Sequence, residues 1–554
     1  MPGPELEHET LGPSSRLEKG VLLAVLGWLA AFVGYKLPHL FDENWIEWDA
    51  RAMALAAFRF HGKALFPRDL GADLAAAMCP PGWKLVYWVG TLFTNPYQIS
   101  RLLPLAIFAF LLWQAFCFAR TRGGIVVAAV TVFLIARCPF FWDRIIGANP
   151  RAFGLPLVVA FLRYATERRP RAVALVLIAQ AAFYPSVLLL CAPAFAVVQL
   201  VEAVKSRRWQ PLALLAICGL ACAILVAPTA LFVDARIGAP ITLEELAKLR
   251  QRGMWSLYPL PPHRWVFERA IHIALEDEVG PTLLVERWDL IMGGVVIGLA
   301  AVVFAIGLVR RRVPLVFVAL AGTSVGAYAL ASAVAYRLYV PDRMVHYAAP
   351  PIILLLFIPL TLEALMLLPE KRRPPRPRLV AAVLVATITL LAGGPGLSTY
   401  SGLHDWSAGR SPAVEFIATQ QPDVLVAAHP ATSSFVEVFA RRSALFSGIT
   451  NAPNFAQYGL TVEQRIAAFY DAYYASNIED VRAFVQQHRV DYLLVDLRDY
   501  GTEGMKRARY VSPWTEYAQR KILAAHGTFA LAHAPPEAFV FRDGLYVVLD
   551  AKKL

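Results

Sequence analysis

Long apolar stretches separated by short polar linkers make up most of the first 400 residues. Several of these stretches approach or exceed the roughly 20 residues that an α-helix needs to cross a bilayer, and together with shorter ones they give about eleven candidate spans. They predict spans near residues 19–36, 99–119, 124–139, 150–166, 172–184, 186–204, 211–233, 289–309, 313–335, 346–368 and 379–396. The pattern therefore predicts a polytopic α-helical membrane protein.

The linkers between the apolar stretches are basic. Arg and Lys cluster near 120–122, 168–171, 205–208, 310–312 and 371–378. Cytoplasmic loops carry an excess of these residues, so the linkers and the N-terminus are expected inside and the C-terminus outside. The first apolar run, Val21–Val33, lacks a convincing small-residue cleavage site and is interpreted as a retained first helix.

The segment 172–204 decides the topology. Tyr184–Pro185 interrupts it, so it is either two spans meeting at the outer face or one long kinked helix. A single helix would place every later basic linker outside. Two spans are therefore favoured.

Three segments on the predicted outer face are too long to be simple turns. They are 37–98, 234–288 and everything after about 397. The first contains two stretches, Asp49–His61 and Gly82–Phe93, that are typical of helices lying along the membrane surface. The chain thus divides into a membrane domain, residues 1–396, and a soluble extracytoplasmic domain, residues 397–554.

The last segment alternates between two kinds of pattern. Strand-like runs occur at Val424–Ala428, Tyr492–Asp496 and Leu545–Leu549, and helical stretches at Val462–Tyr474 and Ile478–His488. About 155 residues are enough for a core of their own. This alternation predicts a small α/β domain.

Composition agrees with a membrane protein. Hydrophobic residues make up 57% of the chain and charged residues 17%, against about 25% in an ordinary soluble domain. The net charge of +12 lies mostly in the linkers, so it reflects topology and does not indicate a nucleic-acid partner. Cys218 and Cys222 are one helical turn apart in an apolar stretch, which favours core packing over metal binding.

The most informative polar feature is an acidic cluster, Glu47–Trp48–Asp49, directly after the first span. Insertion into a membrane does not require a carboxylate at this position. Two interpretations remain open. The acids could perform chemistry at the outer face, or they could cap and solvate the helix that begins near Asp49.

The residues around this loop resemble the protein O-mannosyltransferase and aminoarabinose-transferase branch of the GT-C glycosyltransferases. Asp49 is followed by Ala57 and Gly62, then by Pro80–Pro81 and by Arg101 before the next span, with the order and spacing of that branch. The branch usually has an acid beside the aspartate, where this chain has Ala50; the nearby acid here is Glu47. The resemblance covers roughly residues 19–120 at the level of motifs.

The resemblance implies an inverting glycosyltransferase. Its donor would be a sugar on a polyprenyl phosphate or diphosphate, and its acceptor a glycan, lipid or protein of the envelope. A carboxylate would take the proton of the acceptor hydroxyl, and Asp49 is the candidate base. Glu47 could assist it, or could join Asp49 in binding a divalent ion such as Mg²⁺ or Mn²⁺. The expected location is the inner (plasma) membrane of a bacterium.

A leaving phosphate requires cations, and the outer loops offer several. The candidate substrate-binding residues are Asp143, Arg144, Arg151, Arg343 and His346. The planar fork of arginine binds two phosphate oxygens at once. The alternative is that these arginines only extend toward lipid headgroups at span ends, and that Asp143 neutralises Arg144.

Two further functions stay open. The chain could be a transporter or flippase of lipid-linked glycans, although no internal repeat is evident. It could also be a non-catalytic scaffold for envelope assembly. If it is an enzyme, the soluble domain and the aromatic residues of loop 234–288 (Trp255, Tyr258, Trp265 and Trp288) could select the acceptor. The alternative is that the soluble domain only stabilises the outer surface or binds a partner protein.

Overall fold

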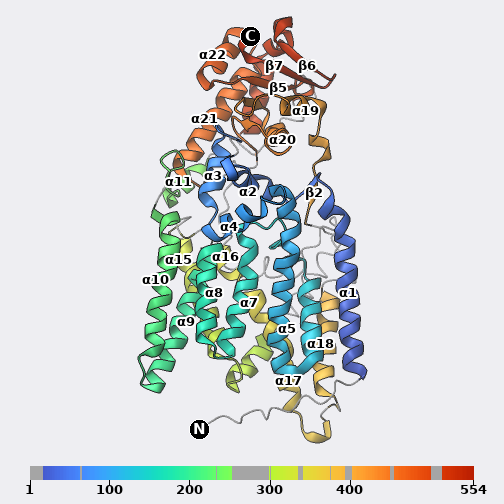
Figure 1. Ribbon diagram of the computed structural model, residues 1–554, viewed down its shortest axis with the longest axis vertical. Coiled ribbons are helices and arrows are strands. Elements are labelled where there is room, and N and C mark those ends of the chain that lie inside the picture. Colours follow the sequence, from blue (N-terminus) through green and yellow to red (C-terminus); the bar gives the residue numbers. More distant parts are fainter. Residues whose placement is uncertain are drawn as a thin grey trace.

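The computed structural model describes residues 16–62, 65–231, 234–251, 298–299, 301–334, 338, 341–372, 374, 376–392, 402–448, 454–500, 504 and 514–554. Roughly parallel helices form the lower two thirds of the molecule, and a sheet with surrounding helices forms the top (Figure 1). The helices of the first outer loop lie between these two parts. The predicted loop aromatics at 255–288 lie outside the described residues.

The lower part consists of long apolar helices. They are α1 (Arg16–Phe41), α5 (Pro96–Arg137), α7 (Gly154–Thr166), α8 (Pro170–Phe183), α9 (Pro185–Ser206), α10 (Gln210–Leu231), α15 (Leu315–Ala333), α17 (Ala349–Met366) and α18 (Pro377–Ala392). Among the described residues, six helices are long and apolar enough to cross a membrane, and shorter apolar helices occur at Pro170–Phe183 and Pro377–Thr387. Ile217, Leu220 and Ile224 of α10 are each more than 60% exposed, as expected of a face turned toward lipid.

The chain reverses within α5. Gly124 has a φ of 78°, which glycine adopts without steric cost and which ends the helical conformation there. A straight helix would separate Phe108 from Trp142 by about 50 Å. Their ring centroids are only 5.3 Å apart. The two halves of α5 therefore form an antiparallel pair, as the predicted spans 99–119 and 124–139 require.

A second reversal lies at Tyr184, between α8 and α9. Cys218 Sγ of α10 donates to the carbonyl of Ala174 in α8 at 3.7 Å. Ala174 is near the start of α8, and α10 begins four residues after α9 ends. If α8 and α9 formed one straight helix, the start of α10 would lie about 50 Å from Ala174. The two-helix interpretation of 172–204 therefore fits the structure. Cys218 and Cys222 are both buried in the apolar core, as predicted.

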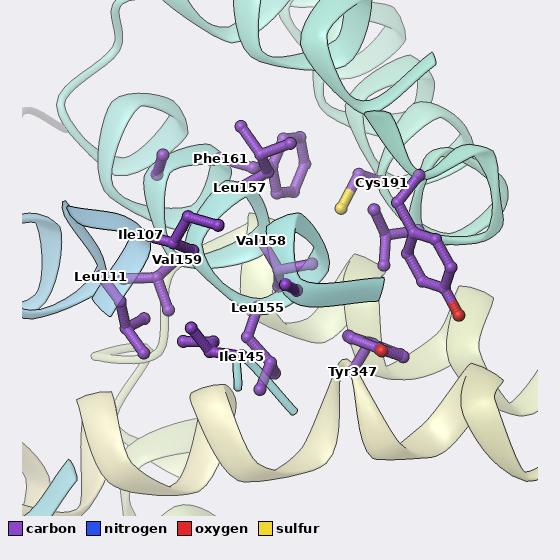
Figure 2. Close-up of a cluster of buried hydrophobic side chains, with 14 of the residues drawn as sticks. Ile107, Leu111, Ile145, Leu155, Leu157, Val158, Val159, Phe161, Cys191 and Tyr347 are labelled. Carbon is purple, nitrogen blue, oxygen red and sulfur yellow. The ribbon is translucent and has the colours of Figure 1, made fainter. Parts of the chain in front are cut away.

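Helix α7 is the centre of the helical core. Every residue from Gly154 to Leu162 is buried, as expected of a helix that is apolar on all sides. In Figure 2, Leu155 and Val159 of α7 lie next to Ile145 and to Leu111 of α5. A short 3-10 turn, η2 (Pro150–Phe153), precedes α7 directly. The residues of this turn are thereby attached to a helix that is buried on all sides from Gly154 to Leu162.

The upper part contains a five-stranded mixed sheet in the order β4-β3-β5-β7-β6. Its strands are β3 (Leu425–Ala428), β4 (Ser443–Ala444), β5 (Tyr492–Asp496), β6 (Phe539–Arg542) and β7 (Tyr546–Asp550). Strand β3 is parallel to β4 and β5, whereas β7 is antiparallel to β5 and β6. The helices around the sheet are α19 (Pro412–Ala418), α20 (Pro430–Phe435), α21 (Ala456–Tyr473), α22 (Ile478–His488) and α24 (Trp514–Ala524).

The first outer loop joins the two parts. It contains α2 (Ala50–Ala57), α3 (Leu70–Met78) and α4 (Pro81–Gly90). Leu70 and Leu74 of α3 belong to the same apolar core as the residues beneath the sheet. A two-stranded antiparallel ribbon also connects the parts, because β1 (Trp45–Ile46) pairs with β2 (His404–Asp405). The sequence predicted α2 and α4 but not α3 or this ribbon.

Candidate active site

The acidic cluster forms the turn between β1 and α2. Asp49 occupies the N-cap position of α2 but makes no side-chain capping hydrogen bond. The carboxylate of Glu47 accepts the hydrogen bond from the backbone N–H of Ala50 instead, at 2.7 Å. The predicted alternative of helix capping therefore applies to Glu47, whereas the carboxylate of Asp49 is turned to another partner.

Glu47 is a buried carboxylate with partners on both oxygens. Its residue is 5% exposed. Oε2 accepts from Asn149 Nδ2 at 2.9 Å, and Oε1 accepts from Arg151 Nη2 at 2.9 Å. Burial and the neighbouring charge of Asp49 raise the pKa of Glu47 to about 7, although Arg151 and the backbone N–H groups oppose the rise.

Gly147 leaves the room that Glu47 requires. A Cβ at this position would lie 2.5 Å from Glu47 Oε2, closer than any van der Waals contact. Gly147 also has a φ of 83°, where a residue with a side chain is strained. In the sequence GANPR, the glycine thus allows Glu47 to approach the backbone closely, and the side chains of Asn149 and Arg151 bind the Glu47 carboxylate.

Arg151 bridges the two acids. Its Nη1 lies 2.6 Å from Asp49 Oδ2, and its Nη2 lies 2.9 Å from Glu47 Oε1. The Arg151 side chain is 14% exposed, while that of Asp49 is 45% exposed. Burial alone would lower the pKa of Arg151, but the two carboxylates raise it above its ordinary value. Asp49 is thus an accessible carboxylate with one fixed cation beside it.

Two more arginines share this electrostatic environment. Burial lowers the pKa of Arg144, and the positive charges of Arg343 and Arg151 lower it further. Arg144 follows α6 (Pro139–Asp143), and Arg343 belongs to α16 (Asp342–His346). The Arg144–Asp143 ion pair is long, at 4.0 Å, so Asp143 neutralises Arg144 only weakly. Like charges held together in this way favour an anionic ligand.

Two tyrosines line the arginine cluster, and the sequence analysis did not select them as ligands. Arg343 Nη1 donates to the Tyr184 hydroxyl at 3.4 Å, and the Tyr347 hydroxyl donates to the Arg151 carbonyl at 3.4 Å. The two tyrosine rings lie 5.2 Å apart. The Tyr184–Pro185 signal identified a helix break, which the structure has, but a break does not indicate that the tyrosine also contacts an arginine.

The predicted residues therefore come together from distant parts of the chain. Glu47, Asp49, Asp143 and Arg343 all act electrostatically on Arg151. His346 is buried and packs edge-on against the Phe140 ring at 6.2 Å. Lys36 of α1, which was not predicted, is 1% exposed, and its Nζ lies 5.2 Å from the Trp142 ring. Arg101 of the sequence motif donates to the Asp42 carbonyl and so fixes the entry to the loop.

The donor set at the turn does not suit a divalent ion. Both carboxylates are engaged by Arg151, and the second oxygen of Glu47 is engaged by Asn149 and Ala50. Within the described ranges, no group of three His, Cys, Asp or Glu side chains could hold a metal. Arg151 supplies the positive charge between Glu47 and Asp49.

A cavity of about 480 Å³ lies at the other end of α2. Phe58, His61, Thr91, Phe93 and Arg441 are among its lining residues, and no acid is among them. It therefore lacks a carboxylate, the type of base that the sequence analysis predicts. We place the candidate chemistry at the acidic turn.

Comparison with known proteins gives structural matches only. Neither a protein-family model nor a curated protein sequence matches the chain. The oligosaccharyltransferase of Archaeoglobus fulgidus, in complex with Zn and sulfate, matches with a TM-score of 0.50 and 12% identity over 90% of this chain and 70% of that one. ArnT from Cupriavidus metallidurans, bound to undecaprenyl phosphate, matches with a TM-score of 0.48 and 13% identity over 95% and 98%. The chain therefore shares its fold with the Archaeoglobus fulgidus oligosaccharyltransferase, in agreement with the GT-C resemblance of the sequence.

Proposed function

We propose that this chain, a membrane protein with the GT-C fold, is an inverting glycosyltransferase that uses a sugar donor linked to a polyprenyl phosphate. Its acceptor would be a glycan, lipid or protein of the cell envelope. The observation that carries the proposal is the environment of Asp49. An accessible carboxylate is held by Arg151 at 2.6 Å, beside a cluster of arginines at the ends of membrane helices.

The arginine cluster suits the phosphate of the donor. Arg144 and Arg343 lie within the electrostatic reach of one another and of Arg151. Arginine binds phosphate oxygens through a planar fork, and its charge does not depend on pH in the physiological range. The position at the ends of apolar helices is where the headgroup of a lipid would lie. A donor anchored by a polyprenyl chain needs a phosphate site at this depth.

The reaction can be written with these residues. The acceptor hydroxyl gives its proton to the Asp49 carboxylate while its oxygen attacks the anomeric carbon of the donor sugar. The bond between that carbon and the phosphate oxygen breaks, and the polyprenyl phosphate leaves with the electron pair. Arg144 and Arg343 stabilise the negative charge that develops on it. Asp49 then releases its proton to water.

Glu47 and Arg151 have positioning roles in this scheme. Glu47 binds Arg151 and the first N–H of α2, so it fixes both the arginine and the turn that carries Asp49. Arg151 keeps the Asp49 carboxylate oriented. Holding reacting groups in place is a large part of catalysis, and a buried ion pair is suited to it.

The proposal includes a topology. Eleven spans, with the N-terminus in the cytoplasm and the basic linkers inside, would put Asp49 and the 397–554 domain outside the inner membrane of a bacterium. The soluble domain would then lie over the reacting groups. Its contact with the first loop, through β1–β2 and the core shared with α3, supports a role in acceptor choice.

The test is a comparison of envelope glycans and glycolipids by mass spectrometry in four strains. They carry the wild-type gene, no gene, Asp49→Asn or the control Asp423→Asn, which changes an exposed acid of the soluble domain. We expect one glycosylated product to be lost without the gene and with Asp49→Asn but retained with Asp423→Asn. Removal of a positioned base lowers the rate roughly a hundred- to ten-thousand-fold. A product that persists with Asp49→Asn and disappears without the gene would favour a scaffold or a transporter.

A further inference from the structure

Trp48, the residue between the two acids, is the unexplained member of the turn. Its neighbour Glu47 is buried, yet Trp48 is 51% exposed. The side chain is not a loose surface residue, because Arg51 and Trp406 contact it. A large aromatic ring that is both exposed and fixed, one residue from the candidate base, calls for a ligand.

Arg51 holds two tryptophans in place. Its guanidinium carbon lies 4.5 Å from the Trp48 ring centroid and 3.4 Å from that of Trp406. Arg51 itself is 2% exposed. A cation–π contact is stronger when the cation is desolvated, so the guanidinium is a strong anchor for both rings.

The C-terminal part of the chain supplies the rest of the aromatic cluster. The rings of Trp48 and Trp406 lie 5.2 Å apart at 57°, and His404 lies 6.1 Å from Trp48 and 6.0 Å from Trp406. Trp406 Nε1 donates to the Ile46 carbonyl at 3.0 Å. We call Trp48, His404 and Trp406 the aromatic platform. Its geometry is fixed by the β1–β2 ribbon.

The platform and the arginine cluster approach Asp49 from different elements. The platform rests on β2, which Figure 1 places next to the soluble domain. The arginines come from the ends of α6, η2 and α16, and Figure 1 places α16 among the upper ends of the membrane helices. Trp48 directly precedes Asp49 in the sequence, and Arg151 forms an ion pair with Asp49. A carboxylate between a phosphate site and an aromatic surface can take a proton from whatever rests on that surface.

We propose that the aromatic platform is the acceptor subsite and that it binds a sugar ring, so that the acceptor is a saccharide or carries one at its reacting end. This rests on the proposed function. A pyranose presents a face of C–H groups, which the negative face of an aromatic ring attracts. The hydroxyl that reacts would then lie beside the Asp49 carboxylate, whose side chain is 45% exposed.

The test measures saccharide binding without any transfer reaction. The full-length protein in nanodiscs is titrated with the methyl glycosides of glucose, galactose, mannose and N-acetylglucosamine, and saturation-transfer difference NMR reports contacts of the sugar C–H groups. The variants are Trp48→Ala, Trp48→Phe and Asp49→Asn. Trp88→Ala is the matched control, because Trp88 of α4 is 47% exposed and has no described contact with the platform.

We expect at least one glycoside to bind the wild type. Trp48→Ala should weaken it about tenfold and Trp48→Phe only about twofold, because phenylalanine retains an aromatic face. Trp88→Ala should leave it unchanged. Equal loss in Trp48→Ala and Trp88→Ala, as expected if both residues only anchor the protein in the interface, would overturn the proposal. The proposal would also be overturned if none of the glycosides bound. It would likewise be overturned if an acidic or hydroxylated peptide bound in place of the glycosides and its binding depended on Trp48.

Asp49→Asn separates this inference from the function on which it rests. The variant should still bind the glycoside, because the platform is intact, and should fail to produce the envelope product. If envelope glycans are unchanged in Asp49→Asn while saccharide binding still depends on Trp48, the proposed function fails and the binding site stands. If the product is lost in Asp49→Asn and no glycoside binds, the function stands and the assignment of the platform fails.

Discussion

Glu47 and Asp49 are two residues apart, but their removal should have opposite consequences. Replacing Glu47 by alanine leaves Arg151 Nη2, Asn149 Nδ2 and the Ala50 N–H without the acceptor that each contacts at 2.7–2.9 Å. Breaking a buried ion pair by removing one partner costs about 3–5 kcal/mol, because the remaining charge stays buried. We therefore expect Glu47→Ala to be strongly destabilised.

Asp49→Asn should behave differently. The Asp49 side chain is 45% exposed, and an ion pair at that exposure contributes at most about 1 kcal/mol. The asparagine oxygen can still accept from Arg151. This variant should unfold close to the wild-type temperature while losing transfer activity.

The assay is thermal unfolding of the three purified proteins in the same detergent, followed by intrinsic fluorescence at one scan rate. Membrane proteins of this size often unfold irreversibly, so only the differences between variants are interpreted. The unfolding temperature should drop strongly in Glu47→Ala and hardly at all in Asp49→Asn. A similar drop in both would show that the two acids have equivalent structural roles, and the distinction between positioning residue and base would have to be abandoned.

Four further expectations concern the candidate site and the membrane topology. Arg144→Gln should weaken binding of a polyprenyl phosphate, measured by native mass spectrometry, about ten- to a hundredfold, since hydrogen bonds between charged groups contribute roughly 1.5–3 kcal/mol. The pKa of Glu47 rises from 4.5 to about 7 on folding, so the stability that Glu47 contributes is fully present below about pH 4.5 and is lost as the pH rises through 7. The unfolding temperature of the wild type should therefore fall relative to that of Glu47→Gln between pH 4.5 and 7. A difference between the two proteins that stays constant over this range would contradict the expectation. Gly147→Ala should lower the unfolding temperature, because its Cβ would meet Glu47 Oε2 at 2.5 Å, whereas Gly27→Ala in open space should not. Topology reporters fused after Arg208 should lie in the cytoplasm, and those fused at Val424 should lie outside the membrane. A cytoplasmic reporter at Val424 would refute the eleven-span topology.

The sequence predicted what is encoded locally. Apolar runs and basic linkers gave the helices of the lower part, and the strand-like runs at 424–428 and 492–496 lie within one residue of β3 and β5. The acids of the site were selected because insertion does not require a carboxylate after the first span, and the arginines because a leaving phosphate requires cations in the outer loops. These signals do not depend on knowing which segments meet in space.

What the sequence did not reveal depends on contacts between distant segments. Arg51 lies within a short amphipathic stretch and looks like an ordinary surface residue, yet it is buried between Trp48 and Trp406. The contribution of α3 to the core beneath the sheet could not be foreseen, because Leu70 and its partners are several hundred residues apart. The division of work between Glu47 and Asp49 likewise depends on Asn149 and Arg151, which no local pattern assigns to one acid or the other.

The β1–β2 ribbon has a consequence for how the protein is made. The hydrogen bond between Trp406 and Ile46 joins positions 360 residues apart. At about 5–20 residues per second, a ribosome needs roughly 20–70 s to synthesise that length of chain. During this interval the first helices are already in the membrane, and the turn with Asp49 lacks the strand that completes it. The acidic turn would therefore take its final shape only after residue 406 has been synthesised, when about three quarters of the chain is complete, and the proposed transfer could not begin before then.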